Sequence, residues 1–202
     1  MITELVVATR NRKKVEEIRR ILEGIPVKLY SLDDFPGCPE VEEDADTFEG
    51  NAVKKALAVA GYTGKPAIAD DSGLEVYALN GAPGVWSARY AGADADDKKN
   101  LEKLLSELRG IEKEERGARF VCVIALASPD GRGETFQGLI EGRIGTEPIG
   151  FNGFGYDPVF YPAGFDRTFA EMSPGEKDAL SHRGRALERL RSRLSSLIAA
   201  QS

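Results

Sequence analysis

Residues 5–22 read LVVATRNRKKVEEIRRIL, and this order predicts a strand, a polar turn and then a helix. Residues 5–8 are the strand, because a short apolar run bounded by polar residues suits a buried strand. The helix runs from about residue 13 to residue 22, since Val15 and Ile18 begin an apolar face at helical spacing. A strand that feeds directly into a helix is the building unit of α/β folds.

The remainder of the chain adds further strands, further helices and one hairpin. We expect strands at residues 27–30, 67–69, 74–76, 118–127 and 135–144. We expect helices at about residues 47–60 and 96–108, a helical turn from Pro174, and a last helix marked by Ala186 to Leu197. Because strand–helix units are mixed with a hairpin, the fold class is α/β, with a mixed, twisted sheet flanked by helices. No repeat or linker divides the chain, so we expect one domain over residues 1–202.

The composition excludes several classes of partner. Asp and Glu number 33 against 27 Lys and Arg, which gives a net charge of −6, whereas proteins that bind duplexes usually show a basic excess. No apolar run approaches the roughly 20 residues of a membrane span, and the first residues lack the pattern of a secretion signal. We therefore expect no nucleic-acid partner, no membrane and a cytoplasmic location. The chain has one histidine, so any metal must be held mainly by oxygen.

The polar turn after the first strand is the first candidate site. It consists of Thr9, Arg10, Asn11, Arg12, Lys13 and Lys14. A helix N-terminus offers free N–H groups and a partial positive charge, and short polar and basic side chains extend it into an anion cradle. The alternative is an ordinary capped turn with solvated lysines. Neither a Walker loop nor the usual dinucleotide fingerprint occurs here.

Two adjacent carboxylates, Asp70 and Asp71, follow the expected strand at residues 67–69 and precede Ser72 and Gly73. Carboxylates that leave a buried strand are costly unless something compensates their charge. Mg²⁺ would compensate it, because Mg²⁺ binds one or two carboxylates together with waters and substrate phosphates. The alternative is a turn, for which Asp-Ser-Gly is common chemistry.

Two later segments carry groups suited to a flat, polar ligand. Residues 150–158 read GFNGFGYDP, and aromatic residues separated by glycines let backbone and ring faces approach such a ligand closely. Rings that pack inward are the alternative. Lys177 and the triplet Ser181-His182-Arg183 supply cations that can grip a phosphate or a carbonyl oxygen. For the lone histidine, the alternative is a packing or capping role.

Together these features resemble the inosine triphosphate pyrophosphatase family, whose members hydrolyse deaminated purine triphosphates such as ITP, dITP and XTP to the monophosphate and pyrophosphate. The resemblance runs nearly from end to end. The matching blocks are Thr9-x-Asn11-x-x-Lys14, Thr47-Phe48 with Asn51-Ala52 and Lys55-Ala56, Asp70 to Leu74, Gly81 to Gly84, Ser87 to Gly92, Gly153 to Pro158, and Ser181 to Arg183.

The resemblance implies a role for each matching position. The triphosphate would contact Thr9, Arg10, Asn11, Arg12, Lys13, Lys14 and Lys55. Asp71 would be the general base and a Mg²⁺ ligand, and Ser72 would touch the substrate. The second metal carboxylate would be Glu40, which follows a proline, with Glu42 and Glu43 as alternatives. The purine base and sugar would contact Phe154, Gly155, Tyr156, Asp157, Lys177, His182 and Arg183.

The resemblance also implies two lobes around a central cleft and a homodimer, for which the loop from Trp86 to Tyr90 is a candidate interface or a packed lid. The sequence departs from the family pattern at Arg10, where glycine is common, and at Gly50, where glutamate is usual. Arg10 would narrow the cradle or add a phosphate contact. Two alternative functions are a pyrophosphatase for other modified or pyrimidine nucleotides, and a nucleotide-sensing or RNA-binding module without turnover.

Overall fold

The computed structural model describes residues 2–93 and 96–200 and contains a six-stranded sheet in the order β2-β1-β3-β4-β5-β6. The strands are β1 (Glu4–Val7), β2 (Lys28–Ser31), β3 (Ala67–Val76), β4 (Gly117–Ala127), β5 (Gly133–Ile144) and β6 (Phe160–Pro162). The α-helices are α1 (Arg12–Ile21), α2 (Phe48–Thr63), α3 (Asp97–Glu107), α4 (Pro174–Leu180) and α5 (His182–Ala199). β1 pairs in parallel with β2 and with β3, whereas β5 and β6 are antiparallel. The predicted α/β fold with a mixed sheet is confirmed.

The chain divides into two compact units. Unit 1 comprises Met1–Asp71, Cys122–Gly138 and Arg183–Ser202, and unit 2 comprises Ser72–Val121 and Leu139–His182. Each unit has its own hydrophobic core.

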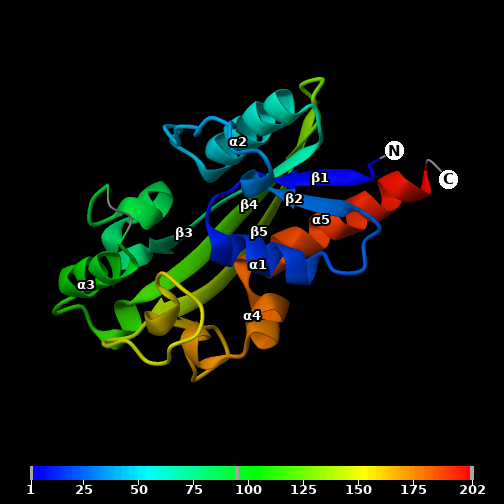
Figure 1. Cartoon of the computed structure of the whole chain (residues 1–202). Coiled ribbons are helices and arrows are strands. Elements are labelled where there is room, and N and C mark those ends of the chain that lie inside the picture. The colour runs from blue at the N-terminus through cyan, green and yellow to red at the C-terminus, as the bar shows by residue number, and fades with distance from the viewer. Residues whose placement is uncertain (1, 94–95, 201–202) are drawn as a thin grey trace. The chain divides into compact units, whose positions relative to one another are not determined.

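The core of unit 1 lies where α1 and α5 pack on the sheet. Ile18 and Leu22 from the α1 segment and Leu187 and Leu190 from α5 are buried together with Leu5 of β1. α2 lies on the other side of β1 (Figure 1). Apolar faces on both sides of the strands explain why β1 reads as a continuous apolar run.

The helices of unit 1 begin at side-chain caps. Asn11 caps α1, because its Oδ1 accepts hydrogen bonds from the backbone N–H groups of Lys13 and Lys14 at 3.1 and 3.3 Å. Thr47 caps α2 through Oγ1, which accepts from Gly50 N at 3.0 Å. The last residue of α2 is followed by Gly64 at φ +64°, a left-handed conformation that glycine adopts without strain.

The core of unit 2 is rich in aromatic rings. The ring centroids of Phe120 and Phe160 are 4.6 Å apart, and those of Phe160 and Phe169 are 5.2 Å apart. Leu101 and Leu104 of α3 pack into the same cluster. Burial of several large rings supplies much of the hydrophobic stabilisation that a unit of this size requires.

The structure corrects two details of the predicted elements. β3 is unbroken over Ala67–Val76, whereas the sequence suggested a strand at residues 67–69, a turn, and a second extended segment. β6 was not expected, because its three residues are too few to show a period. The predicted start of a helix at Pro174 is confirmed by a capping box between Ser173 and Glu176.

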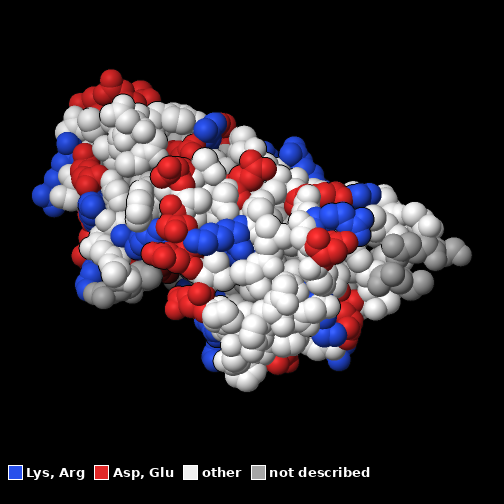
Figure 2. Space-filling view, turned by 90° about the horizontal axis from the view of Figure 1, so that it is seen from above, with Lys and Arg blue, Asp and Glu red and all other residues white. Residues whose placement is uncertain are grey.

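Charges of both signs are mixed on one face of the surface. On the face drawn in Figure 2, lysine and arginine side chains lie next to aspartate and glutamate side chains. Across the described ranges, none of the helices combines the length and the apolar character that crossing a bilayer requires.

Candidate active site

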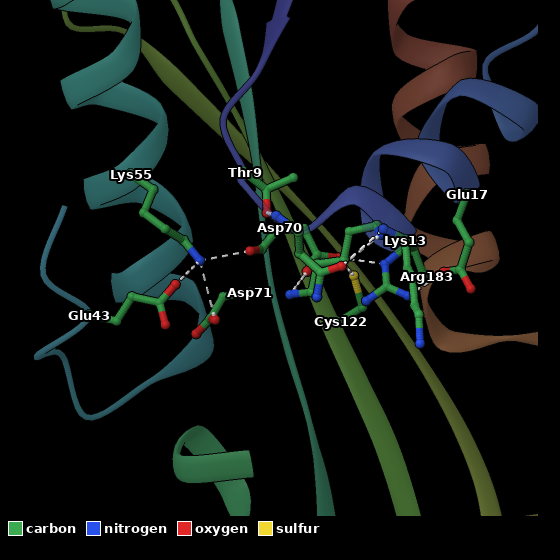
Figure 3. Close-up of polar contacts among 11 residues, drawn as sticks. Thr9, Lys13, Glu17, Glu43, Lys55, Asp70, Asp71, Cys122 and Arg183 are labelled. Carbon is green, nitrogen blue, oxygen red and sulfur yellow. Dashed lines mark hydrogen bonds and ion pairs between the residues drawn. The ribbon is translucent and has the colours of Figure 1, made fainter. Parts of the chain in front are cut away.

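The adjacent residues Asp70 and Asp71 lie in the middle of β3, and their side chains point in different directions (Figure 3). The expected strand end before Asp70 is therefore wrong. Successive side chains of a strand point to opposite faces of the sheet. The two carboxylates consequently enter separate sets of contacts within unit 1.

Asp70 is the centre of a buried charge network. Its Oδ1 accepts a hydrogen bond from Lys14 Nζ, and its Oδ2 accepts from Arg183 Nε at 2.8 Å and from Cys122 Sγ at 3.1 Å. Burial alone would raise the pKa of Asp70, but the charges of Arg183 and Lys14 outweigh burial and hold this pKa well below its usual value. With both oxygens engaged and its charge fixed, Asp70 is unsuited to accept a proton.

The same network contains Glu17, which accepts a hydrogen bond from Arg183 Nη1. Arg183 therefore lies between two carboxylates, and both its own side chain and that of Glu17 are buried. Burial raises the pKa of the Cys122 thiol well above its ordinary value, so the thiol keeps its proton and donates to Asp70. These contacts connect α1, β3, β4 and α5.

On the opposite face of β3 from the Asp70 side chain, Asp71 and Glu43 both contact Lys55. Lys55 Nζ donates to Glu43 Oε1 and, at 2.8 Å, to the backbone carbonyl of Asp70, and lies 3.4 Å from Asp71 Oδ1. Burial alone would lower the pKa of Lys55, but Asp71 and Glu43 outweigh it and raise this pKa above its ordinary value. Lys55 is therefore an ammonium ion held by α2 against β3 (Figure 3).

Asp71 has the properties of a proton acceptor. Its pKa is raised, chiefly because its side chain is buried, and the nearby charges of Lys55 and Lys14 reverse only part of that effect. Within the part of the chain that the structure describes, its buried Oδ2 has no hydrogen-bond partner. A buried oxygen without a partner is costly unless a ligand engages it.

The polar turn presents its backbone and its basic side chains at the start of α1. Thr9 Oγ1 accepts from Asn11 N at 3.2 Å, and Asn11 in turn caps the helix. The first turn of α1 contains no acidic residue, and Arg12 and Lys13 are exposed. This arrangement leaves a partial positive charge at the helix start, where anions bind favourably.

Unit 2 holds the groups that were predicted to contact a base, except Arg183, which lies in unit 1. Asp157 Oδ2 accepts hydrogen bonds from Lys177 Nζ at 2.6 Å and from Phe154 N at 2.9 Å. Asp157 and Lys177 are both buried. Lys177 Nζ lies 4.8 Å from the centroid of the Phe154 ring. Gly153 adopts φ +73°, and a Cβ there would lie 2.0 Å from Asp157 Oδ2, so only glycine allows this contact.

Two other predicted contact residues take part in the core of unit 2. Tyr156 is buried, and its hydroxyl donates to the Ser87 carbonyl at 2.8 Å. The His182 ring stacks on Phe120, with centroids 4.6 Å apart and the planes inclined by 9°. Gly155 N donates to Asp97 Oδ2 at 3.0 Å, which joins the glycine-rich loop to α3.

The model of the Ham1 family matches residues 5–193. The chain belongs to the Ham1 family. A dITP/XTP pyrophosphatase of Geobacter sulfurreducens is 55% identical to it over 193 residues, which are 96% of this chain and 97% of that protein. The solved Ham1 protein of Staphylococcus aureus is 41% identical with a TM-score of 0.85, and that of Coxiella burnetii is 45% identical with a TM-score of 0.87. In both comparisons 96% of this chain and 98% of the other are covered.

In this Ham1-family chain the acidic segment brings Glu43 to the lysine beside Asp71. Glu40 and Glu42 are exposed, whereas Glu43 is half-buried and pairs with Lys55. Of the three glutamates left open as the second metal carboxylate, Glu43 therefore has the geometry that favours the role. Among the described residues, no three acidic, histidine or cysteine side chains are grouped as a ready-made metal centre. Mg²⁺ does not require one, because one or two carboxylates with substrate phosphates suffice.

The Arg10 side chain contacts the segment before α2. Its Nη2 donates to the carbonyl of Cys38 at 2.8 Å, and so connects the polar turn to the segment that leads to Glu43. A glycine, which the family resemblance leads us to expect at this position, has no side chain for this bond. Ser72 follows Asp71 directly and is half-buried.

Sequence reasoning missed two members of the network in unit 1. Glu17 lies three residues after Lys14, so both are on the same side of α1, and an acidic residue next to Ile18 was a weak signal of a buried ion pair. Cys122 carried no signal, because a cysteine in an apolar strand resembles any small core residue.

Proposed function

We propose that this Ham1-family chain is a nucleoside triphosphate pyrophosphatase that hydrolyses ITP, dITP and XTP to the monophosphate and pyrophosphate. The observation that carries the proposal is the buried carboxylate of Asp71, with its raised pKa, next to the lysines of unit 1. A raised pKa brings a carboxylate closer to the range in which a general base works well. The dITP/XTP pyrophosphatase of Geobacter sulfurreducens supports the substrate class.

We propose Mg²⁺ as the cofactor, held by Asp71 and Glu43. The fit rests on an all-oxygen donor set and on Asp71 Oδ2, which is buried without a hydrogen-bond partner in the described ranges. Mg²⁺ bound there supplies a Lewis acid that polarises phosphate oxygens and lowers the pKa of water. Glu40, the position suggested by the resemblance, is exposed, whereas Glu43 is half-buried.

The residues of unit 1 have different roles in hydrolysis. Asp71 accepts the proton of the water that attacks the α-phosphorus. Lys14 and the amides at the start of α1 hold the triphosphate, with Thr9, Arg12 and Lys13 at its edge. Lysine charge stabilises the negative charge that develops on the pyrophosphate leaving group.

The residues of unit 2 would bind the purine. Phe154 would stack on the ring, and Asp157 would accept from a ring N–H. Lys177 and His182 would donate to the carbonyl oxygen at the 6-position. Adenine has an amine there, so donor would face donor and polar groups would remain unpaired. A base contact by Arg183 stays a prediction, and its known partners are Asp70 and Glu17.

We further propose that the two units act as one catalytic domain, that the protein is a homodimer, and that it acts in the cytoplasm. The family resemblance supports the dimer. The half-exposed Trp86, whose ring lies 4.6 Å from the Arg89 guanidinium carbon, is the candidate contact. The two-lobe cleft also stays a prediction.

Incubation of the protein with Mg²⁺ and ITP or XTP is expected to release pyrophosphate. Attack at the α-phosphorus gives pyrophosphate, whereas attack at the terminal phosphorus gives orthophosphate. Parallel reactions with GTP, ATP and dUTP, each assayed for both products, measure the specificity. Preferred turnover of dUTP would favour the pyrimidine alternative. Comparable kcat/KM for ATP and ITP would contradict the donor argument, and no release from any nucleotide would favour a binding module.

Phe154→Ala is expected to raise KM for ITP about tenfold with a smaller change in kcat, because base–aromatic stacking contributes roughly 1–3 kcal/mol per base. Phe151→Ala is the matched control. That ring is 95% exposed three residues earlier in the same loop, and its removal is expected to leave KM unchanged. Equal effects of the two substitutions on steady-state KM would contradict a stacking role for Phe154.

A further inference from the structure

Lys55 holds oxygens that a divalent cation also needs. Its ammonium group donates to Glu43 Oε1 and lies 3.4 Å from Asp71 Oδ1, and its third contact is the carbonyl of Asp70 at 2.8 Å. The three contacts come from the segment before α2 and from β3 (Figure 3). An ammonium has three N–H donors, and here all three directions are occupied.

A cation that binds Asp71 and Glu43 must compete with this ammonium. Two positive charges within a few ångströms repel each other strongly in a partly buried site. The Lys55 side chain is 12% exposed and that of Asp71 is 9% exposed, so solvent screens their charges only weakly. The divalent cation therefore gains less from the two carboxylates while Lys55 is on them.

A triphosphate changes this competition. Its oxygens carry several negative charges and offer the ammonium an alternative set of acceptors. When Lys55 turns to a phosphate oxygen, its contacts with Asp71 Oδ1 and Glu43 Oε1 are broken, and the repulsion between its ammonium group and a cation at these carboxylates falls. Lysine suits such an exchange, because it is a single point charge on a flexible four-carbon chain.

We propose that Lys55 makes divalent-cation binding at Asp71 and Glu43 depend on the nucleotide, so that the two ligands bind cooperatively. The proposal rests on the proposed function insofar as the partner ligand is a nucleoside triphosphate. Cooperativity is reciprocal by thermodynamic linkage, so the cation also tightens the nucleotide. Lys55 is here a positioning residue that controls access to the two carboxylates.

The test is calorimetric titration of MgCl₂ into the protein at pH 8, without nucleotide. Lys55→Met is expected to bind Mg²⁺ tighter than wild type, on the order of tenfold, because the competing charge is removed. Lys54→Met is the matched control. Lys54 is the preceding residue of α2, and its exposed ammonium pairs with Asp44 at 2.6 Å, away from Asp71. It is expected to bind Mg²⁺ as wild type does. Unchanged or weaker binding by Lys55→Met would overturn the proposal.

A second titration includes α,β-methylene ITP, which the protein cannot cleave at that bond. Wild type is expected to bind Mg²⁺ about 5- to 150-fold tighter with the analogue than without it, the usual range of such coupling. Lys55→Met is expected to keep only the part of this difference that comes from direct contact between Mg²⁺ and the phosphate oxygens. Equal coupling in the two proteins would overturn the proposal. Failure of the proposed function is a separate result, because it would show in the turnover assay and leave the titration without nucleotide intact.

Lys55→Cys is a second variant if Lys55→Met does not give a folded protein by circular dichroism. Alkylation of the introduced thiol with bromoethylamine restores an ammonium at nearly the original length. Cys38 and Cys122 are buried, so the reagent reaches the introduced thiol first. Tight Mg²⁺ binding before alkylation and wild-type binding after it are expected. The same affinity in both forms would overturn the proposal.

Discussion

Asp71→Asn is expected to lower kcat for ITP hydrolysis by about 10²- to 10⁴-fold, the range that a positioned general base contributes. The amide retains the shape of the side chain and cannot accept the proton of the attacking water. Nucleotide binding is expected to persist in part, because Lys14 and the turn before α1 are unchanged. Steady-state kinetics and equilibrium titration with the analogue measure the two effects separately, and rates like those of wild type would contradict the assignment.

The pH dependence of the same reaction follows from the direction of the Asp71 pKa. A base must be ionised to act, and the pKa of Asp71 is raised by burial. Protonation of Asp71 is therefore expected to abolish activity on acidification, and Mg²⁺ held by the same carboxylate would move this loss to a lower pH than in the metal-free protein. Asp44→Asn, which changes an exposed carboxylate, is the control and should keep the wild-type profile.

The Asp71→Asn substitution is expected to lower activity without lowering the free energy of unfolding. A carboxylate whose pKa is higher in the folded state binds more protons there than in the unfolded state, so its ionisation lowers stability as pH rises between the two pKa values. Removal of that charge is expected to leave the protein at pH 8 as stable as wild type or more stable. Urea unfolding measures this difference.

Local patterns predicted most of the elements because their signals are local. The helix at α1 is fixed by the spacing of Val15 and Ile18 and by the cap at Asn11, all within one segment. The hairpin of β4 and β5 is marked by Pro129-Asp130-Gly131. The short strand β6 carries no such pattern, because its pairing with β5 is decided by residues far away in sequence.

The reading of Asp70 to Gly73 as the end of a strand was wrong for a physical reason. Aspartate, serine and glycine are disfavoured in strands and typical of turns, so their local preference opposes β3. Here tertiary contacts decide the conformation, because Lys14 and Arg183 compensate Asp70, and Lys55 compensates Asp71. Such conflicts between local preference and structure are expected at functional sites.

The sequence indicates which residues belong to the site better than it indicates which of them contact each other. Lys14, Lys55 and Asp71 were identified as candidates, yet the choice of Glu43 among the three glutamates needed the three-dimensional path of the loop. The pairing of Arg183 with Glu17 joins residues 166 positions apart, which no single-sequence pattern reveals. For the same reason Cys122 was not recognised as a donor to Asp70.

Asp70→Asn is expected to destabilise the protein by about 3–5 kcal/mol, since removal of one partner leaves a buried charge uncompensated. Arg183 would lose its ion pair with Asp70 while that with Glu17 remains, and Lys14 would lose its ion pair with Asp70. The measurement is urea unfolding at pH 7. Asp130→Asn, which removes an exposed carboxylate paired with Arg132, is the control and should leave the unfolding midpoint nearly unchanged.

The contribution of the Asp70 carboxylate to stability is expected to change with pH in the direction opposite to that of Asp71. The pKa of Asp70 is lowered in the folded protein, so its contribution to stability is fully present above the unfolded value of about 3.9. That contribution is lost as pH falls through the folded pKa. The difference in stability between wild type and Asp70→Asn is therefore expected to narrow below about pH 4, and a constant difference would contradict an electrostatic cause.

A double substitution separates charge compensation from packing. If Asp70 stabilises the fold by holding Arg183, then Asp70→Asn combined with Arg183→Leu should cost less than the sum of the two single changes. Additive costs would mean that each side chain acts through its own packing. The neighbouring Asp71→Asn is expected to be neutral or stabilising in the same assay. Substitution of two adjacent aspartates would then change the stability in opposite directions. The reason is that the side chains of Asp70 and Asp71 point to opposite faces of the sheet in β3.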